Sequence, residues 1–178
     1  MKKLVIVRHG IESRDDVMRS DAENPLAPRG RRETATAVGQ FVSLGNRADA
    51  IVASYARRSL DTAEIWKKAL KVPDERLRVE TDIYEAERSD ILRIVRQLDD
   101  ANDTVVLIGH NPGVIELLHH LVGRGVERMT PSSFAVISLE TDSWSRISLQ
   151  GTELVHYYAP PPAATDQSLW QRLAFWRR

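Results

Sequence analysis

Two histidines and nearby arginines are the residues of this chain whose types and spacing best suit chemistry. His9 follows Arg8, His110 lies far along the chain, and Arg57 and Arg58 form a second basic pair. A guanidinium group matches phosphate geometry through paired hydrogen bonds, and a neutral imidazole can attack phosphorus. A single histidine is usually structural and a pair of arginines is usually solvated. Together, these side chains indicate phosphoryl transfer.

Short apolar runs precede all of these residues. Residues 4–7, 50–53 and 104–108 are mostly β-branched, which is typical of strands buried on both faces of a parallel sheet. Ligands of open α/β sheets bind beyond the carboxyl ends of the strands. We therefore expect both histidines and the basic pair to lie at one edge of the sheet.

Helices and further strands complete the predicted elements. On the helix expected over 28–44, Ala35, Val38, Phe41 and Val42 are predicted to share the buried face. The alternation of strands and helices predicts an α/β fold. The other expected helices cover 56–70, 89–98 and 114–122, and the other expected strands cover 77–81, 134–139 and 145–149.

The composition excludes several classes of protein. The 178 residues include 25 basic and 25 acidic side chains, so nothing indicates nucleic-acid binding. The chain has no cysteine, which excludes disulfides, zinc–thiolate sites and cysteine nucleophiles and favours a reducing compartment. Because no apolar stretch approaches the roughly 18 residues of a membrane span, we expect a soluble, cytoplasmic protein without stable membrane insertion.

We expect one domain over residues 1–159, followed by a different kind of segment over 160–178. Pro160-Pro161-Pro162 would stiffen the chain as a linker. Apolar residues then recur on one face of a possible amphipathic helix: Leu169, Trp170, Leu173 and Trp176. This helix could dock on its own domain, contact a partner or lie on a membrane surface.

The turn at each histidine suits an anion. Gly10 follows His9, and Asn111-Pro112-Gly113 leads from His110 into a predicted helix. A helix N-terminus offers unpaired N–H groups and the positive end of a dipole. Gly10 and Asn111 are therefore candidates for phosphate binding beside the two histidines.

Four ordered segments give the chain a family resemblance. Residues 8–10 (Arg-His-Gly), 25–30 (Pro-Leu-Ala-Pro-Arg-Gly), 54–62 (Ser-x-x-x-Arg-x-x-x-Thr) and 106–112 (Val-Leu-Ile-Gly-His-Asn-Pro) resemble motifs of the histidine phosphatase superfamily. The superfamily includes cofactor-dependent phosphoglycerate mutases and SixA-type phosphohistidine phosphatases. The resemblance implies a phosphoglycerate mutase-like, three-layer αβα sandwich with a mostly parallel central sheet.

The resemblance also implies roles for individual residues. His9 would be the nucleophile, and Arg8, Arg58 and His110 would bind and polarise the phosphoryl group. Glu85 is the candidate general acid for an alcohol leaving group, with Glu87 as its nearby competitor.

Three rim positions depart from the family pattern and leave the substrate preference open. Ala27 replaces a usual threonine, Tyr55 a common proline, and Asn24 an arginine frequent in SixA-like chains.

The expected reaction uses a phosphohistidine enzyme intermediate without a metal or other cofactor. The expected substrate is phosphohistidine on a partner protein, or alternatively a small phosphate ester. A mutase is less attractive because the short chain shows no large insertion to exclude water. A non-catalytic phosphate-binding module is the alternative from a different class. The adjacent His119 and His120 point about 100° apart on a helix, which argues against a zinc site there.

Overall fold

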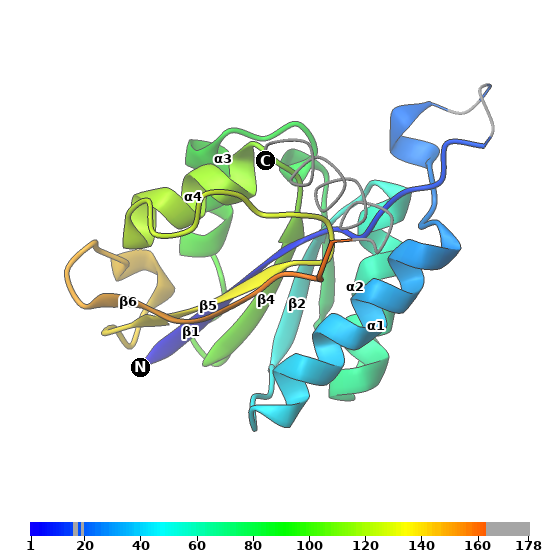
Figure 1. The fold of residues 1–178 in the computed structure, drawn as a ribbon. Coiled ribbons are helices and arrows are strands. Elements are labelled where there is room, and N and C mark those ends of the chain that lie inside the picture. The colour runs from blue at the N-terminus through cyan, green and yellow to red at the C-terminus, as the bar shows by residue number, and fades with distance from the viewer. Residues whose placement is uncertain (16–17, 19, 163–178) are drawn as a thin grey trace, which may run out of the picture.

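The computed structural model describes residues 1–162 apart from positions 16, 17 and 19, and it shows one sheet between helices (Figure 1). The strands are β1 (Lys2–Arg8), β2 (Ala50–Ser54), β3 (Leu77–Glu80), β4 (Thr104–Gly109), β5 (Phe134–Leu139) and β6 (Thr152–Tyr158). The helices are α1 (Pro28–Ser43), α2 (Arg57–Leu70), α3 (Arg88–Arg96) and α4 (Gly113–Val122). Single 3₁₀ turns are η1 (Asp21–Glu23), η2 (Asp74–Arg76), η3 (Thr81–Ile83) and η4 (Trp144–Arg146).

The strand order is β3-β2-β4-β1-β5-β6. Strands β1 to β4 pair in parallel, while β5 is antiparallel to both of its neighbours, β1 and β6. The direction of β6 is therefore that of β1, and β5 alone runs against the described sheet. The predicted α/β fold with a mostly parallel sheet is confirmed.

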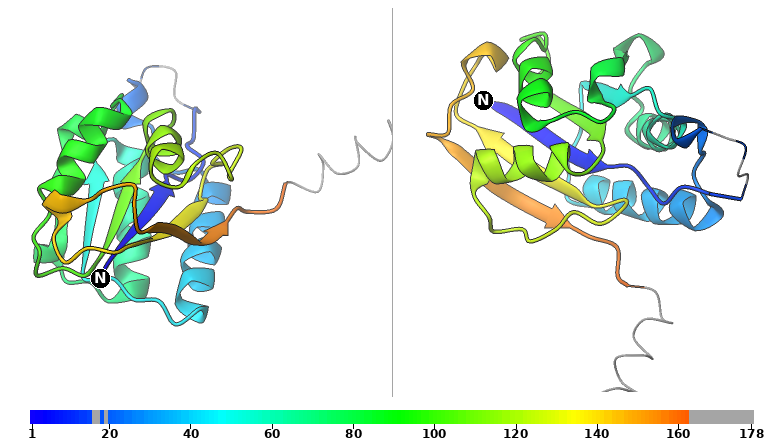
Figure 2. Two further views of the ribbon diagram at one scale, coloured as in Figure 1. Left: turned by 90° about the vertical axis from the view of Figure 1, so that its left-hand side faces the viewer. Right: turned by 90° about the horizontal axis from the view of Figure 1, so that it is seen from above.

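Alternating side chains of the strands build one apolar layer on each face of the sheet. In β1, Leu4 and Ile6 pack in the layer under α3 and α4, whereas Val5 and Val7 pack in the layer under α1 and α2. All four side chains are fully buried. Figure 2 shows the helix pairs on opposite faces, so the expected three-layer sandwich is confirmed.

The strand predicted over 145–149 is wrong. This segment contains η4 and a loop, and the outer strand is β6. Trp144 determines the local structure: its side chain is fully buried, and its indole N–H donates to the Asn102 carbonyl at 2.9 Å. Anchoring this large ring turns the chain away from the sheet edge, which a two-residue alternation pattern cannot reveal.

The predicted buried face of α1 is partly wrong. Ala35 and Val42 are exposed, although Val38 and Phe41 are buried as expected. The face that packs on the sheet follows spacings of three and four residues and includes a glycine and a threonine, which a search for apolar residues passes over. Its members are Gly30, Thr34, Ala37, Val38 and Phe41.

The domain boundary near residue 159 remains a prediction. The last described strand, β6, ends at Tyr158. The amphipathic helix expected within 163–178 lies outside the described residues.

Candidate active site

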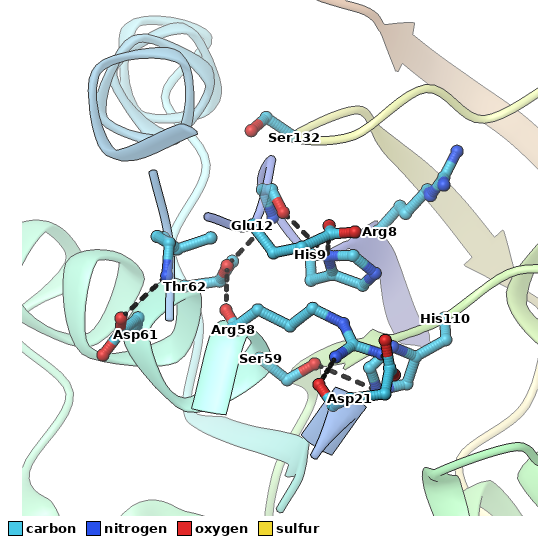
Figure 3. Close-up of polar contacts among 12 residues, drawn as sticks. Arg8, His9, Glu12, Asp21, Arg58, Ser59, Asp61, Thr62, His110 and Ser132 are labelled. Carbon is cyan, nitrogen blue, oxygen red and sulfur yellow. Dashed lines mark hydrogen bonds and ion pairs between the residues drawn. The ribbon is translucent and has the colours of Figure 1, made fainter. Parts of the chain in front are cut away.

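The sheet brings the two predicted histidines together. Strands β1 and β4 are parallel neighbours with Arg8 opposite Gly109, so His9 and His110 leave the sheet side by side. The backbone N–H of His9 donates to the Gly109 carbonyl at 3.1 Å. The centroids of the two imidazole rings are 4.7 Å apart, and Figure 3 shows both rings beside Arg58.

The hydrogen bonding of His9 determines which ring nitrogen can react. Its Nδ1 lies 2.7 Å from the Gly10 carbonyl oxygen, which can only accept, so Nδ1 carries the proton and Nε2 keeps its lone pair. Burial, followed by the charges of Arg58 and Arg8, lowers the pKa of His9 to about 4. The side chain is therefore a neutral imidazole at pH 7, as a nucleophile must be.

A carboxylate that the sequence did not single out lies close to His9. Glu12 Oε2 is 4.0 Å from His9 Nδ1. Burial raises the pKa of Glu12, but the hydrogen bonds from its own backbone and then from Arg14 outweigh this effect and lower the pKa. Glu12 is therefore ionised at pH 7 and reinforces the Nδ1–H tautomer of His9.

His110 is also held neutral. Burial, followed by the repulsion that a protonated His9 and Arg58 exert, lowers its pKa to about 3. Its Nε2 is 3.3 Å from Ser59 Oγ, and the ring of Tyr84 meets it nearly edge-on, with centroids 5.5 Å apart. A neutral His110 can donate one hydrogen bond to a phosphoryl oxygen. Because it carries no charge, it does not repel the neighbouring arginines.

Arg8 is fixed by the backbone on one side of the site. Its Nη1 donates to the Met129 carbonyl at 2.8 Å, and the side-chain amide of Asn111 donates to the same oxygen at 3.1 Å. Burial lowers the pKa of Arg8, but an arginine remains charged at neutral pH. Its buried Nε–H has no partner among the described residues and is free for an anion.

Arg58, the other predicted phosphate ligand, is almost completely buried in front of the histidines. Its Nη1 donates to the Asp21 carbonyl at 2.6 Å, and its Nη2 donates to the Asp21 carboxylate at 2.8 Å. Its guanidinium carbon lies 5.8 Å from the centre of the Tyr84 ring. No local pattern predicts that Asp21 pairs with Arg58, because 37 residues separate them along the chain.

Gly10 has a structural role in the turn after β1. Its N–H donates to Thr62 Oγ1 at 3.1 Å, so this donor is already used. A Cβ at this position would lie 2.6 Å from Thr34 Oγ1, which leaves room for glycine alone. Thr62 in turn donates to the Arg58 carbonyl at 2.8 Å. The threonine of the 54–62 motif thus links the histidine turn to the helix that carries Arg58.

Arg57 points to the rim, away from the two histidines. Its Nε donates to Asp61 Oδ1 at 3.0 Å, and its side chain is 60% exposed. Asp61 also accepts from Arg31 at 2.7 Å and from the backbone N–H of Leu26 at 3.1 Å. These bonds hold the 25–30 segment against α2.

Glu85 lies at the surface just beyond Tyr84. Its backbone has a positive φ of 53°, and its side chain is exposed. Its carboxylate makes no hydrogen bond or ion pair with any residue that the structure describes. Glu87, the competing candidate, begins α3 through a capping box with Asp90.

The three departures from the family pattern lie around η1. Asn24 is buried, and Ala27 is the residue directly before α1. The Tyr55 ring packs on Tyr84 with centroids 5.3 Å apart. Tyr55 also lines a surface hollow of about 540 Å³ next to the site, together with Ala22, Glu23, Pro25, Arg57 and Leu60.

Within residues 1–162, leaving out 16, 17 and 19, no group of three histidine, aspartate or glutamate side chains could hold a metal ion. In the same part of the chain, no helix has both the length and the hydropathy that a membrane span needs.

Comparison with known proteins agrees with this geometry. Residues 4–91 match the model of the histidine phosphatase superfamily (branch 1). The structure of a putative phosphohistidine phosphatase SixA from Nakamurella multipartitia shares 24% identity and covers 89% of this chain and 96% of its own, with a TM-score of 0.78. A protein histidine phosphatase SixA complexed with tungstate shares 20% identity at 89% and 97% coverage, with a TM-score of 0.74.

A small-molecule phosphatase also has this fold. The mycobacterial glucosyl-3-phosphoglycerate phosphatase shares 17% identity at 90% and 100% coverage, with a TM-score of 0.64. At these levels of identity, the similarity to these structures shows that the fold is shared. Phosphatases named for different substrates have this fold.

Proposed function

Because this chain belongs to the histidine phosphatase superfamily, we propose that it is a phosphatase that removes the phosphoryl group from phosphohistidine of a partner protein by way of His9. The observation that carries this proposal is the state of His9. Its Nδ1–H is bonded to the Gly10 carbonyl, which leaves an unprotonated Nε2 in a pocket that contains Arg8, Arg58 and His110.

In the first step, the lone pair of His9 Nε2 forms a bond to phosphorus. The bond from phosphorus to the substrate nitrogen breaks, and its electron pair stays on the leaving imidazole, which is protonated at its other nitrogen and so departs neutral. Arg8 and Arg58 stabilise the negative charge on the three phosphoryl oxygens, and His110 donates a hydrogen bond to one of them.

In the second step, water attacks the phosphorus of phosphohistidine 9. A P–O bond forms, the P–Nε2 bond breaks, and the proton lost by the water goes to the solvent or to the released phosphate. The sum of both steps is hydrolysis of phosphohistidine to histidine and phosphate, and Nε2 regains its lone pair.

Two observations support a protein as substrate. The chain resembles SixA-type phosphatases both in the segments 8–10 and 106–112 and in fold. In the structure, Asp21 and Tyr84 at the mouth of the site are largely exposed or half-buried, so a side chain that projects from another protein can enter. The absence of cysteine supports the cytoplasm as the compartment of the reaction.

Glu85 is the proposed general acid when the leaving group is an alcohol. It follows Tyr84 at the mouth, and its carboxylate is exposed. The imidazole of phosphohistidine arrives protonated at its other nitrogen and does not need this acid. We therefore expect Glu85→Gln to slow ester hydrolysis more than phosphohistidine hydrolysis; equal loss on both substrates would exclude Glu85 from this role.

The deciding experiment compares wild type with His9→Ala in the presence of a chelator. Substrates are para-nitrophenyl phosphate and a phosphohistidine-bearing protein, and labelled enzyme is trapped as acid-labile phosphate. We expect turnover and labelling of wild type, loss of both in His9→Ala, and faster turnover of the phosphohistidine protein. His120→Ala is the control, since this histidine lies on α4 and should leave activity unchanged.

Each other result has a definite meaning. Faster turnover of the ester would favour a small-molecule phosphomonoesterase. No turnover and no labelling of a folded wild type would overturn the proposal in favour of a phosphate-binding module.

A further inference from the structure

An acidic side chain occupies the mouth of the proposed site. Asp21 of η1 binds Arg58 through both its backbone carbonyl and its carboxylate. The Asp21 side chain is 55% exposed and that of Arg58 only 9%, so the carboxylate lies on the solvent side of the guanidinium (Figure 3). This acid is therefore built into the entrance through a buried arginine.

Tyr84 fixes the position of this carboxylate from the opposite element. The Tyr84 hydroxyl donates to the same Asp21 oxygen at 2.9 Å, and the Tyr84 ring packs on His110. Two donors on one oxygen hold the side chain in place. The charge of Asp21 also reaches His110, whose pKa it raises against the larger lowering by burial.

Asp21 is a permanent negative charge at neutral pH. The hydrogen bond from Tyr84, and after it that from Arg58, lowers the pKa of this carboxyl below its usual range. A carboxyl group with a lowered pKa carries no proton at pH 7 and cannot act as a general acid. Its effect on the reaction is electrostatic.

Carboxylates offset part of the positive charge around the histidines. Among the described residues, Asp21 is paired with Arg58, and Glu12, which lies 4.0 Å from His9, is paired with Arg14, while both imidazoles are neutral. A site whose arginine charge is partly offset gives a dianionic ester less attraction than free arginines would. It suits a substrate in which a positive leaving group offsets part of the phosphoryl charge.

The geometry of displacement places the leaving group near Asp21. In an in-line attack the leaving atom lies opposite the nucleophile. His9 is buried, with 5% of its surface exposed, so the opposite side is the open mouth that Asp21 and Tyr84 border. Charge on the leaving group is therefore felt by the Asp21 carboxylate.

We propose that Asp21 is a specificity-determining residue that favours a cationic nitrogen leaving group over an alcohol. The leaving group of an ester goes from neutral toward negative in the transition state, which the carboxylate opposes. The protonated imidazole of phosphohistidine goes from positive toward neutral, and the carboxylate stabilises the positive charge that remains. This inference rests on the proposed function and assigns to Asp21 the preference for an N-phosphorylated imidazole over an ester.

The test removes the charge of Asp21 and keeps its shape. Asp21→Asn retains an oxygen that can accept from Arg58 and Tyr84. The probes are two small substrates, N-phosphoimidazole and para-nitrophenyl phosphate, compared by kcat/KM at pH 7 so that docking of a partner protein plays no part. We expect the ratio of the two kcat/KM values to shift about tenfold toward the ester, equivalent to about 1.4 kcal/mol.

Two controls separate charge from structure. Asp15→Asn removes a charge from an exposed position of the same loop and should leave the ratio unchanged. Tyr84→Phe removes the donor but keeps the Asp21 charge; any loss of activity should be shared by both substrates. A positioning effect of Asp21 on Arg58 alone would likewise lower both kcat/KM values equally.

The outcomes distinguish this inference from the proposed function. Labelling of His9 and turnover of both probes by wild type, with an unchanged ratio in Asp21→Asn, would refute the role of Asp21 and leave the function standing. A wild type that neither turns over nor becomes labelled would refute the proposed function and this inference with it.

Discussion

Acidification to pH 5 tests the protonation state of His9 directly. Burial and the two arginines lower the pKa of His9 from 6.5 to about 4. At pH 5 about nine in ten His9 rings are then neutral, whereas an ordinary histidine would be neutral in about three of a hundred molecules. We therefore expect phosphorylation of His9 to retain most of its neutral-pH rate at pH 5.

The same difference in pKa makes the free energy of unfolding depend on pH. The unfolded chain takes up a proton on His9 near pH 6.5, but the folded protein does so only near pH 4. The free energy of unfolding is therefore highest, as far as His9 contributes, above pH 6.5 and falls as the pH decreases toward 4. The loss from His9 is of the order of 3 kcal/mol. His110, with its pKa lowered to about 3, acts in the same direction.

An NMR titration of the histidine rings measures the pKa of His9 without interference from substrate ionisation. The sample is kept under conditions where far-UV circular dichroism shows the native fold, and the chain unfolded in urea serves as the reference for an ordinary pKa. A His9 midpoint near 6.5 in the folded protein would refute the reasoning. A fall of more than about tenfold in the phosphorylation rate between pH 7 and 5, with the fold intact, would refute it too.

Three substitutions test other parts of the structure. Gly30→Ala should lower the free energy of unfolding by about 1–3 kcal/mol, because its Cβ would lie 2.2 Å from a backbone oxygen. Gly39 is on the same helix, and a Cβ there would meet open space, so Gly39→Ala should instead raise the free energy of unfolding by about 0.5–1 kcal/mol. Urea titrations measure both changes. An equal effect of both would contradict this packing. Arg58→Lys should lower kcat/KM about 100-fold or more with an unchanged melting temperature, because the single ammonium group of lysine cannot replace the paired N–H donors of the guanidinium. Near-normal activity would exclude Arg58 as a phosphate ligand. Asp61→Asn weakens two ion pairs and should lower the free energy of unfolding by about 1–3 kcal/mol, measured by thermal unfolding. Its ratio of the two kcat/KM values should remain that of wild type. An unchanged melting temperature would show that these pairs contribute nothing to stability.

The parts of the site that follow buried strands were predictable from the sequence. The runs at 4–7 and 104–108 had no plausible place other than a parallel sheet, and parallel strands deliver the residues that follow them to one edge. The juxtaposition of His9 and His110 therefore follows from local patterns and one general property of α/β folds.

The parts that depend on loops and on side-chain packing were not predictable. Asp21 meets Arg58 only because the loop after β1 folds back across α2, and nothing in residues 11–27 specifies that path. Likewise, the buried face of α1 includes Thr34, whose hydroxyl is bonded to Ser132 Oγ at 3.0 Å. A polar residue is buried there because a distant partner satisfies it, and a single segment of sequence does not contain that information.

The pairing of β1 on both sides has a consequence for synthesis of the chain. Lys3 pairs with Thr104 in β4 and with Ser138 in β5, so the strand that precedes His9 leaves the ribosome about a hundred residues before its partners. Contacts this distant in sequence form late, after the entropy of closing a long loop has been overcome. A nascent chain that ends before β5 can form α1 and α2 but has no second neighbour to hold β1 in register. His9 therefore gains its final orientation only after β5 has been synthesised.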